Sequence, residues 1–236
     1  MSITQTVSKF MKMFTIGHSN HSIANFIALL QQHGITAVAD VRSSPYSRRW
    51  PHFNQSTFKK ALQTVGIAYV NLGDNLGARP DDRTCYVDGM ARYDLISATK
   101  GFATGLNRLI QGAKKYQITL MCAEQDPIVC HRAILVCPHL QETDLEINHI
   151  HKNGDLESHE CLENRLLKQH NLYKFLPDDQ NHVKQLSLFD IRPTDTVEKH
   201  LSRQELLQKA YHLQGEKIAY VEQKYSDTED SHEQAS

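Results

Sequence analysis

The alternation of short apolar runs with segments of helical periodicity limits the folds that this chain can adopt. Five runs are rich in β-branched and other apolar residues and read as strands, at residues 14–16, 35–41, 67–72, 118–121 and 145–150. Segments with apolar residues at helical spacing lie between them and after the last, at residues 23–30, 58–65, 97–115 and 158–169. Such alternation predicts an α/β fold with a single mainly parallel sheet and flanking helices.

The domain organisation follows from the length and from shifts in composition. A chain of 236 residues is long enough for one substantial α/β domain, which we expect over residues 13–176 after an extension at residues 1–12. The polar residues 177–222 read as a linker that carries a helix near residues 201–213. Residues 223–236 have the composition of a disordered acidic tail.

Charge and cysteine content restrict the compartment and the partners. The 26 basic and 27 acidic residues give a net charge of -1, which provides no global attraction to nucleic acid or to a membrane. No stretch approaches the roughly 18 apolar residues of a membrane span. Five cysteines without the dense spacing of a secreted disulfide framework indicate reduced thiols, and so a cytoplasmic protein.

The densest group of reactive side chains follows the strand at residues 118–121. Because ligands bind at the carboxyl ends of the strands in an open parallel sheet, this stretch is the first candidate for an active site. The alternative is that both cysteines are small core residues. Their spacing matches neither phosphatase and rhodanese loops nor zinc and thioredoxin motifs, so no metal site is predicted and the cofactor is left open. The predicted catalytic residues are Cys122, Glu124, Asp126, Cys130 and His131.

Other polar residues lie at the ends of strands and in the loop that follows the second strand. They would share the same edge of the sheet and hold an anionic group, although each could alternatively be a structural ion pair, a helix cap or a solvated basic loop. In the same loop, Arg49 would add a cationic group suited to a phosphate, and Trp50 and His52 would add stacking groups for a base. The predicted ligand-binding residues are His18, Ser19, Asp40, Arg42, Arg48 and Arg132.

A histidine pair offers a weaker metal hypothesis. His149 and His151 alternate on a strand and so face one side, with His159 ahead of the next helix. Two ligands on one face can begin a metal site, but no carboxylate or cysteine partner is evident nearby. Hydrogen-bonded or surface histidines are the favoured interpretation.

Several separate motifs, taken together, resemble the bacterial and archaeal family called domain of unknown function 488, over roughly residues 13–170. The family's reaction is not established, so the resemblance implies an α/β domain with a shared polar crevice and leaves substrate and mechanism open. The matching motifs are Thr15-Ile16-Gly17-His18-Ser19, Asp40-Val41-Arg42 with Pro45 and Ser47-Arg48, Leu76-Gly77, Cys122-Ala123-Glu124 with Asp126-Pro127, Cys130-His131-Arg132, and His149-Ile150 with Gly154 and His159.

A second resemblance lies in the polar segment that follows the domain. The residues Gln185, Leu186, Leu188 and Phe189 look like the short peptide by which bacterial replication and repair proteins bind the sliding clamp. The peptide is apolar within a polar stretch and would need only an accessible tether. The alternative is an apolar strand that docks on its own domain.

These observations favour an enzyme of nucleic-acid or nucleotide metabolism, acting in DNA repair or processing and possibly tethered to the sliding clamp. DNA or a nucleotide and the clamp are the expected partners. One alternative is a non-catalytic nucleotide- or DNA-binding module with structural or redox-sensitive cysteines. Another is a metal-dependent hydrolase that uses histidines.

Overall fold

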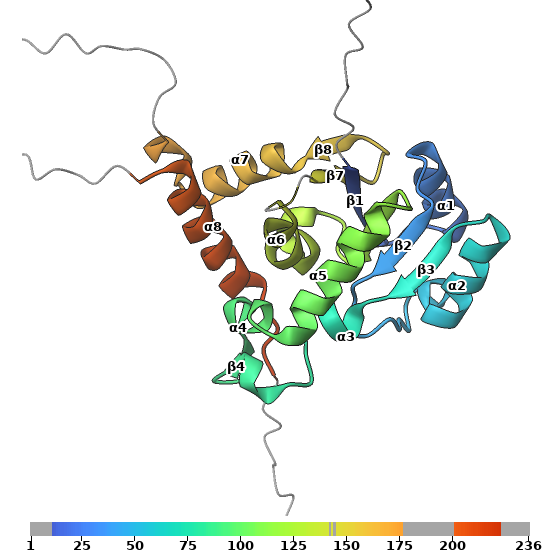
Figure 1. The fold of residues 1–236 in the computed structure, drawn as a ribbon, viewed down its shortest axis with the longest axis horizontal. Coiled ribbons are helices and arrows are strands. Elements are labelled where there is room, and N and C mark those ends of the chain that lie inside the picture. Colours follow the sequence, from blue (N-terminus) through green and yellow to red (C-terminus); the bar gives the residue numbers. More distant parts are fainter. Residues whose placement is uncertain (1–10, 142, 144, 177–200, 223–236) are drawn as a thin grey trace, which may run out of the picture.

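The parallel sheet expected from the sequence is present. The computed structural model describes residues 11–141, 143, 145–176 and 201–222. Its main sheet has six strands in the order β3-β2-β6-β1-β7-β8 (Figure 1). Five strands run parallel, and the short edge strand β8, which the sequence did not predict, runs antiparallel to β7. The strands are β1 Met11–Gly17, β2 Ala37–Asp40, β3 Ala68–Asn71, β6 Ile118–Cys122, β7 Leu145–Ile150 and β8 Leu156–Ser158.

Both faces of the sheet are covered by helices, which explains why the strands are apolar on both sides. Neighbouring residues of β1 show the alternation, since Met13 packs into the core on one face and Phe14 into the core on the other. One face is covered by α1 (Ile23–Gln32) and α2 (Gln55–Thr64). The opposite face is covered by α5 (Lys100–Ala113) and α6 (Cys137–Gln141).

The last two described α-helices form a third apolar cluster beside the two that cover the sheet. The helix α7 (His159–Gln169) begins at the cap Ser158, and α8 (Arg203–Ile218) begins with a capping box formed by Ser202 and Glu205. Their apolar side chains share one cluster with the 3-10 helix η3 (Pro127–Val129). The helix expected near residues 201–213 therefore exists, is longer than expected, and packs directly on the α/β domain.

The polar segment between β3 and α5 is more structured than a simple loop. After α8, the chain pairs with it, because Tyr220 O accepts from Ala91 N at 2.8 Å and Gly89 O accepts from Glu222 N at 2.9 Å. The end of α8 is thus held beside the loops that follow the strands. The segment contains α3 Gly73–Leu76, η2 Arg83–Cys85, β4 Tyr86–Val87, β5 Met90–Ala91 and α4 Tyr93–Ser97.

Three further short elements complete the described chain. They are η1 Pro51–Phe53, the π-helix η4 Arg132–Val136 and η5 Tyr173–Phe175. Among all helices of the described residues, none combines the length and apolarity needed to cross a membrane.

Candidate functional site

The loops that follow β1 and β6 are in direct contact at the carboxyl end of the sheet. The backbone N–H groups of His18 and Ser19 donate to Cys122 O and Ala123 O, each at 2.8 Å. A Cβ atom on Gly17 would lie 1.8 Å from Glu124 O, so only glycine permits this approach. Residues that are far apart in the sequence are therefore brought to one edge, as expected for a parallel sheet.

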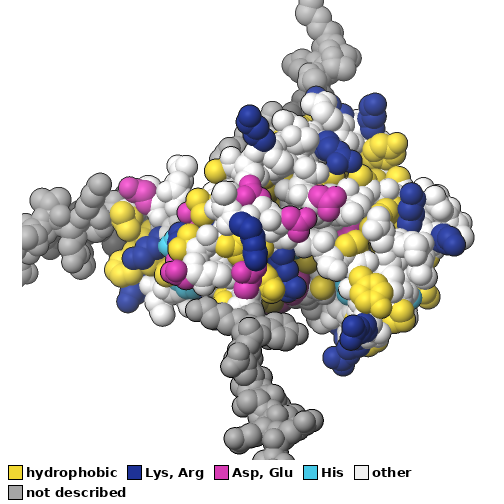
Figure 2. All heavy atoms as spheres, turned by 90° about the horizontal axis from the view of Figure 1, so that it is seen from below, with side chains coloured by type: hydrophobic (Ala, Val, Ile, Leu, Met, Phe, Trp, Pro, Cys, Tyr) yellow, Lys and Arg dark blue, Asp and Glu magenta, His cyan; other side chains and the backbone are white. Residues whose placement is uncertain are grey.

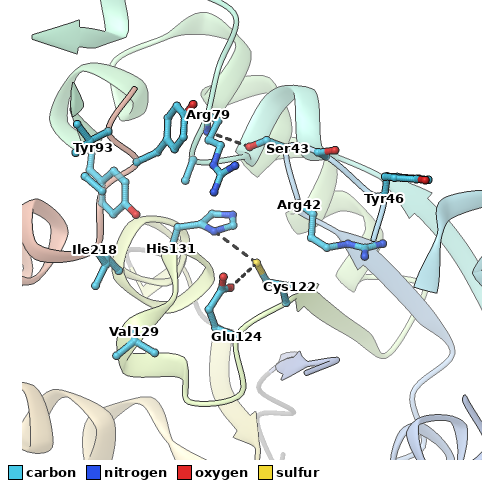
Figure 3. Close-up of a pocket in the computed structure, with 16 residues that line it drawn as sticks. Arg42, Ser43, Tyr46, Arg79, Tyr93, Cys122, Glu124, Val129, His131 and Ile218 are labelled. Carbon is cyan, nitrogen blue, oxygen red and sulfur yellow. Dashed lines mark hydrogen bonds between the residues drawn. The ribbon is translucent and has the colours of Figure 1, made fainter. Parts of the chain in front are cut away.

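A crevice of about 500 Å³ opens at this edge. Figure 3 shows Cys122 and Glu124 coming from the end of β6, with His131 beside them and Arg42 entering from the loop after β2. A second cavity of about 490 Å³ adjoins the crevice, because both are lined by Arg42, Ser44, Tyr46 and Ala123. The two cavities form one polar groove across the ends of the strands.

Four side chains at the floor of the crevice form what we call the thiol cluster: Cys122, Glu124, Cys130 and His131. Both sulfur atoms approach the same carboxylate oxygen, Glu124 Oε2, at 3.1 Å from Cys122 Sγ and 3.0 Å from Cys130 Sγ. The same sulfurs lie 3.6 Å and 4.0 Å from His131 Nδ1. Of the two cysteines, Cys122, at 4% exposure, lines the crevice with Glu124 and His131, while Cys130, at 1%, lies behind it.

The orientation of His131 is fixed by a backbone hydrogen bond. Its Nε2–H donates to Val41 O at 2.9 Å, so Nδ1 is the atom that faces the sulfurs. Thiol, carboxyl and imidazole groups therefore meet with their reactive atoms pointing inward.

Burial and mutual contact shift the pKa values in this cluster. The hydrogen bond to Cys130, together with burial, raises the pKa of Cys122 well above its usual value. Burial opposes ionisation of Cys130, but the bond to Cys122 and the nearby Arg132 lower its pKa well below the usual value. Burial, reinforced by the Cys130 sulfur, raises the pKa of Glu124. The two sulfurs thus favour a state with one thiol and one thiolate.

The opposite side of the groove is built around a buried ion pair. Asp40 accepts from Arg42 Nε at 2.9 Å and from Nη2 at 2.6 Å, and Tyr69 Oη donates to the same carboxylate at 2.9 Å. These bonds hold Arg42 in place at the junction of the two cavities. The predicted residue Asp40 is fully buried, and so its contacts position the guanidinium.

His18 is a neutral acceptor in this arrangement. Its Nδ1–H donates to Ser19 O at 3.1 Å, which leaves Nε2 to accept from Arg42 Nη1 at 3.3 Å. Burial, with a contribution from Arg42, lowers the pKa of His18 to about 4. His18 therefore orients Arg42 and adds no positive charge near pH 7.

Three other predicted residues lie outside the groove. Arg132 is fully buried and donates to Glu124 O at 2.7 Å and to Gln125 O at 3.1 Å, so it holds the loop after β6. Asp126 caps η3 and pairs with Arg165 at 2.9 Å. Arg48 is exposed and lines neither cavity, whereas its neighbour Arg49 lines the second one.

One wall of the crevice comes from segments that the sequence did not suggest. Arg79 stacks over the ring of Tyr220 at 4.3 Å, and both line the cavity with Tyr93 and residues 218–221. The packing of α8 against η3 supports this wall, because Gln214 Nε2 donates to Ile128 O at 2.8 Å. No local sequence signal marks these residues, since the wall forms only when α8 docks.

A further set of polar side chains is buried next to Arg132 and forms what we call the histidine network. The chain of bonds begins at Arg132 Nε, which donates to the hydroxyl of Thr15 at 3.3 Å. The members of the network are Thr15, His149, His159, Tyr211 and Glu163.

The bonds of the histidine network all run in one direction. The Thr15 hydroxyl donates to His149 Nδ1 at 2.8 Å, and His149 Nε2–H donates to His159 Nδ1 at 2.9 Å. His159 Nε2–H then donates to Tyr211 Oη at 3.0 Å, which donates to Glu163 at 3.2 Å. The remaining histidine of the weaker metal hypothesis, His151, instead pairs with Glu157.

Among the described residues, one group brings three possible metal-ligand atoms close together. It consists of Cys122, Cys130 and His131, whose donor atoms all lie within 4.8 Å of one another. The π-helix η4 begins directly after His131. Such widened turns are often found at functional sites.

Charges of both signs are spread over one face of the molecule (Figure 2). Figure 2, which views the molecule from below Figure 1, shows Lys and Arg side chains spread over that face with Asp and Glu side chains between them. An anionic ligand would therefore be held by individual arginines in the groove more than by a broad basic surface.

Residues 22–137 match the protein family described as domain of unknown function DUF488. The chain contains a DUF488 domain. The match confirms the resemblance found in the sequence, over a shorter range than the motifs suggested. The thiol cluster lies inside the DUF488 domain, whereas His18 precedes it and the wall at residues 218–221 follows it. No curated protein and no solved structure matches the chain.

Proposed function

We propose that this protein is an enzyme that acts on a nucleotide or on a nucleic acid in the groove. One observation carries the proposal: the thiol cluster opens into a crevice whose other side presents a positioned guanidinium and aromatic rings. Carboxyl, imidazole and sulfur groups suit proton transfer or covalent chemistry, and arginine suits phosphate. The combination of a reactive floor with a cationic and aromatic wall matches a substrate that has a phosphate and a base.

The assignment of parts follows the geometry. Arg42 lies at the junction of the two cavities, where it would meet a phosphate, and Arg79 would assist from the far wall. Tyr46, which is 63% exposed, and Trp50 offer faces on which a base would stack. The reacting atom would then lie near Cys122 and Glu124, the two members of the thiol cluster nearest to the end of β6.

A binding experiment tests the substrate class. Trp50 is the single tryptophan of the chain and lines the second cavity, so its fluorescence reports occupancy. Titration with nucleoside mono-, di- and triphosphates and with single-stranded DNA and RNA should show saturable quenching for at least one class. Arg49→Gln and Arg79→Gln should each weaken binding about tenfold or more, as expected for the loss of a charge-assisted bond. Arg108→Gln, on the exposed side of α5, is the matched control. If no nucleotide or oligonucleotide changes the fluorescence, this substrate class is wrong.

A turnover experiment separates an enzyme from a binding module. Incubation of the bound nucleotide with the protein should give a product by chromatography and mass spectrometry. Glu124→Gln should abolish the product without abolishing binding, because it removes the acid-base group and keeps the size of the side chain. Binding without turnover, unchanged after alkylation of the cysteines, would instead support the non-catalytic alternative.

We further propose that residues 185–189 tether the protein to the sliding clamp. The peptide lies outside the described residues. It belongs to the segment between Leu176 and Leu201, both of which pack against the same apolar cluster as α7 and α8. A segment held at both ends by the domain would present the peptide on a short tether.

A pull-down with purified sliding clamp tests this tether. The Leu188→Ala, Phe189→Ala double variant should lose the clamp, because the apolar end of such a peptide supplies most of its contact area. Val197→Ala, in the same segment but outside the peptide, should retain the clamp. Equal recovery of the clamp by the wild type and the double variant would refute the tether.

A further inference from the structure

The donor atoms of the thiol cluster converge on one point from three parts of the chain. Cys122 is the last residue of β6, Glu124 lies in the next loop, and Cys130 and His131 stand where η4 begins. The eight-residue separation of the cysteines hides this convergence in the sequence. The fold, and not a local motif, brings the sulfurs together.

We propose that the thiol cluster binds a zinc ion through Cys122, Cys130 and His131, with Glu124 as the fourth ligand. In a tetrahedral zinc site, bonds of about 2.3 Å to sulfur and 2.0–2.1 Å to nitrogen place a sulfur ligand and a nitrogen ligand roughly 3.5 Å apart. The observed sulfur-to-nitrogen distances of 3.6 Å and 4.0 Å are close to this value.

The imidazole is oriented as a metal ligand requires. The Nε2–H of His131 donates to Val41 O at 2.9 Å, so the lone pair of Nδ1 is directed at the sulfurs. Histidine ligands of metals usually donate their other ring N–H to a carbonyl or carboxylate in this way. The backbone directly after β2 thus holds the ring in place, and both ring nitrogens have a role.

The choice of ion follows from the ligand types. Two thiolates and an imidazole favour zinc over magnesium or calcium, which prefer oxygen ligands. A divalent cation would also compensate the negative charge that two buried thiolates would otherwise carry in a site of low exposure. Glu124 Oε2 contacts both sulfurs and lines the crevice, so the fourth ligand is the one that a water or a substrate atom could replace.

This inference deepens the proposed function, because the ion would lie at the floor of the same crevice. There it would polarise a water or a substrate oxygen. Zinc binding is measured without substrate, so the two proposals can fail separately. Loss of zinc binding with intact nucleotide quenching of Trp50 would overturn the zinc site and leave the nucleotide proposal standing.

The decisive experiment is zinc titration of the full chain. The protein is reduced, stripped with a chelator and titrated against a chromophoric zinc indicator, and its zinc content is then measured by elemental analysis. We expect one tightly held zinc ion per chain. Cobalt substitution should give the sulfur-to-cobalt charge-transfer bands and the visible bands of a tetrahedral thiolate site.

Matched variants locate the ion. Cys122→Ser, Cys130→Ser and His131→Gln should each weaken zinc binding at least about a hundredfold, and Glu124→Gln about tenfold. Cys161→Ser, which changes an exposed cysteine of α7, should bind zinc as the wild type does. Zinc binding that survives in both Cys122→Ser and Cys130→Ser would overturn the assignment, as would the absence of tight binding by the reduced wild type.

A measurement on the wild type guards against variants that fail to fold. Zinc should slow alkylation of Cys122 at least about tenfold, because a coordinated sulfur is no longer free to attack. Alkylation of Cys161 in the same sample should proceed at an unchanged rate. Equal alkylation of Cys122 with and without zinc would contradict the proposal.

Discussion

The thiol cluster and the histidine network are both buried and polar, yet they differ in how their hydrogen bonds are completed. In the histidine network, each donor finds an acceptor in a chain that runs from Arg132 to Glu163. In the thiol cluster, two sulfurs share one carboxylate oxygen and one imidazole nitrogen, and the cluster opens into the crevice. One set is closed by protein groups, and the other presents its groups to a ligand.

The difference indicates what each set contributes. Buried polar groups with a full set of partners rigidify a fold, and their removal leaves expensive unpaired atoms. The histidine network joins β1, β7, α7 and α8, and so it fixes the helix whose end forms a wall of the crevice. We infer that the histidine network maintains the site and that the thiol cluster performs its chemistry.

The largest expected effect comes from breaking the histidine network in the middle. His149→Leu would leave the Thr15 hydroxyl and His159 unpaired in the interior and should lower the free energy of unfolding by about 2–5 kcal/mol. Urea denaturation measures the change. His151→Leu, two residues further along the chain, just past the end of β7, and partly exposed, is the control and should cost less than about 1 kcal/mol. If His149→Leu and His151→Leu lowered the free energy of unfolding equally, the histidine network would contribute no more than a partly exposed histidine.

Acid should weaken the histidine network next. Burial lowers the pKa of His159 to about 4 from a usual value near 6.5, so the unfolded chain binds more protons between these values. The stability contributed by neutral His159 is complete above pH 6.5 and is lost as the pH falls toward 4. At pH 4.5 the loss should be on the order of 2–3 kcal/mol.

His18 provides the control for this pH dependence, because burial also lowers its pKa to about 4. In a His18→Gln variant, the free energy of unfolding should still fall on acidification by the amount that the protonation of His159 causes. Urea unfolding at several pH values from 7 to 4.5 measures both slopes. A free energy of unfolding that stays constant over this range would rule out neutral, buried histidines in the fold.

A smaller effect is expected at the far end of the histidine network. Tyr211→Phe removes only the hydroxyl that joins His159 to Glu163, so the free energy of unfolding should fall by about 1–2 kcal/mol. Tyr173→Phe tests a partly exposed tyrosine of η5 and should be nearly neutral. If Tyr211→Phe were as harmless, the network would not extend to α8.

The sequence predicted the elements on which both sets depend, because periodicity is a local property. It identified every parallel strand and placed the starts of α1 and α7 within one residue of where they lie. The position of Cys122 at the same edge as His18 and Arg42 followed from the rule that strand ends share an edge. These predictions used only residue order and the topology of a parallel sheet.

Which side chains line the two cavities depends on packing between distant segments and could not be predicted from the sequence. The sequence named both Cys122 and Cys130 as candidate catalytic thiols, and of the two only Cys122 lines the crevice. It predicted Arg48 as a ligand residue and gave Arg49 only as a neighbouring cationic group, yet Arg49 is the one that lines the second cavity. Which of two neighbouring residues faces a cavity is decided by the turn of a loop, and that turn has no periodic signal in the sequence.

The smallest change in stability is expected in the thiol cluster itself. Cys122→Ser replaces the thiol with a hydroxyl that can still donate to Glu124, at a position open to the crevice. In zinc-free protein the free energy of unfolding should therefore change by less than about 1 kcal/mol, as measured in urea. A loss as large as that of His149→Leu would mean that the thiol cluster supports the fold as the histidine network does. A Cys122→Ser variant that is stable but has lost zinc binding or turnover would instead separate chemistry from folding. The sulfur atom would then contribute little to the free energy of unfolding and be required for activity.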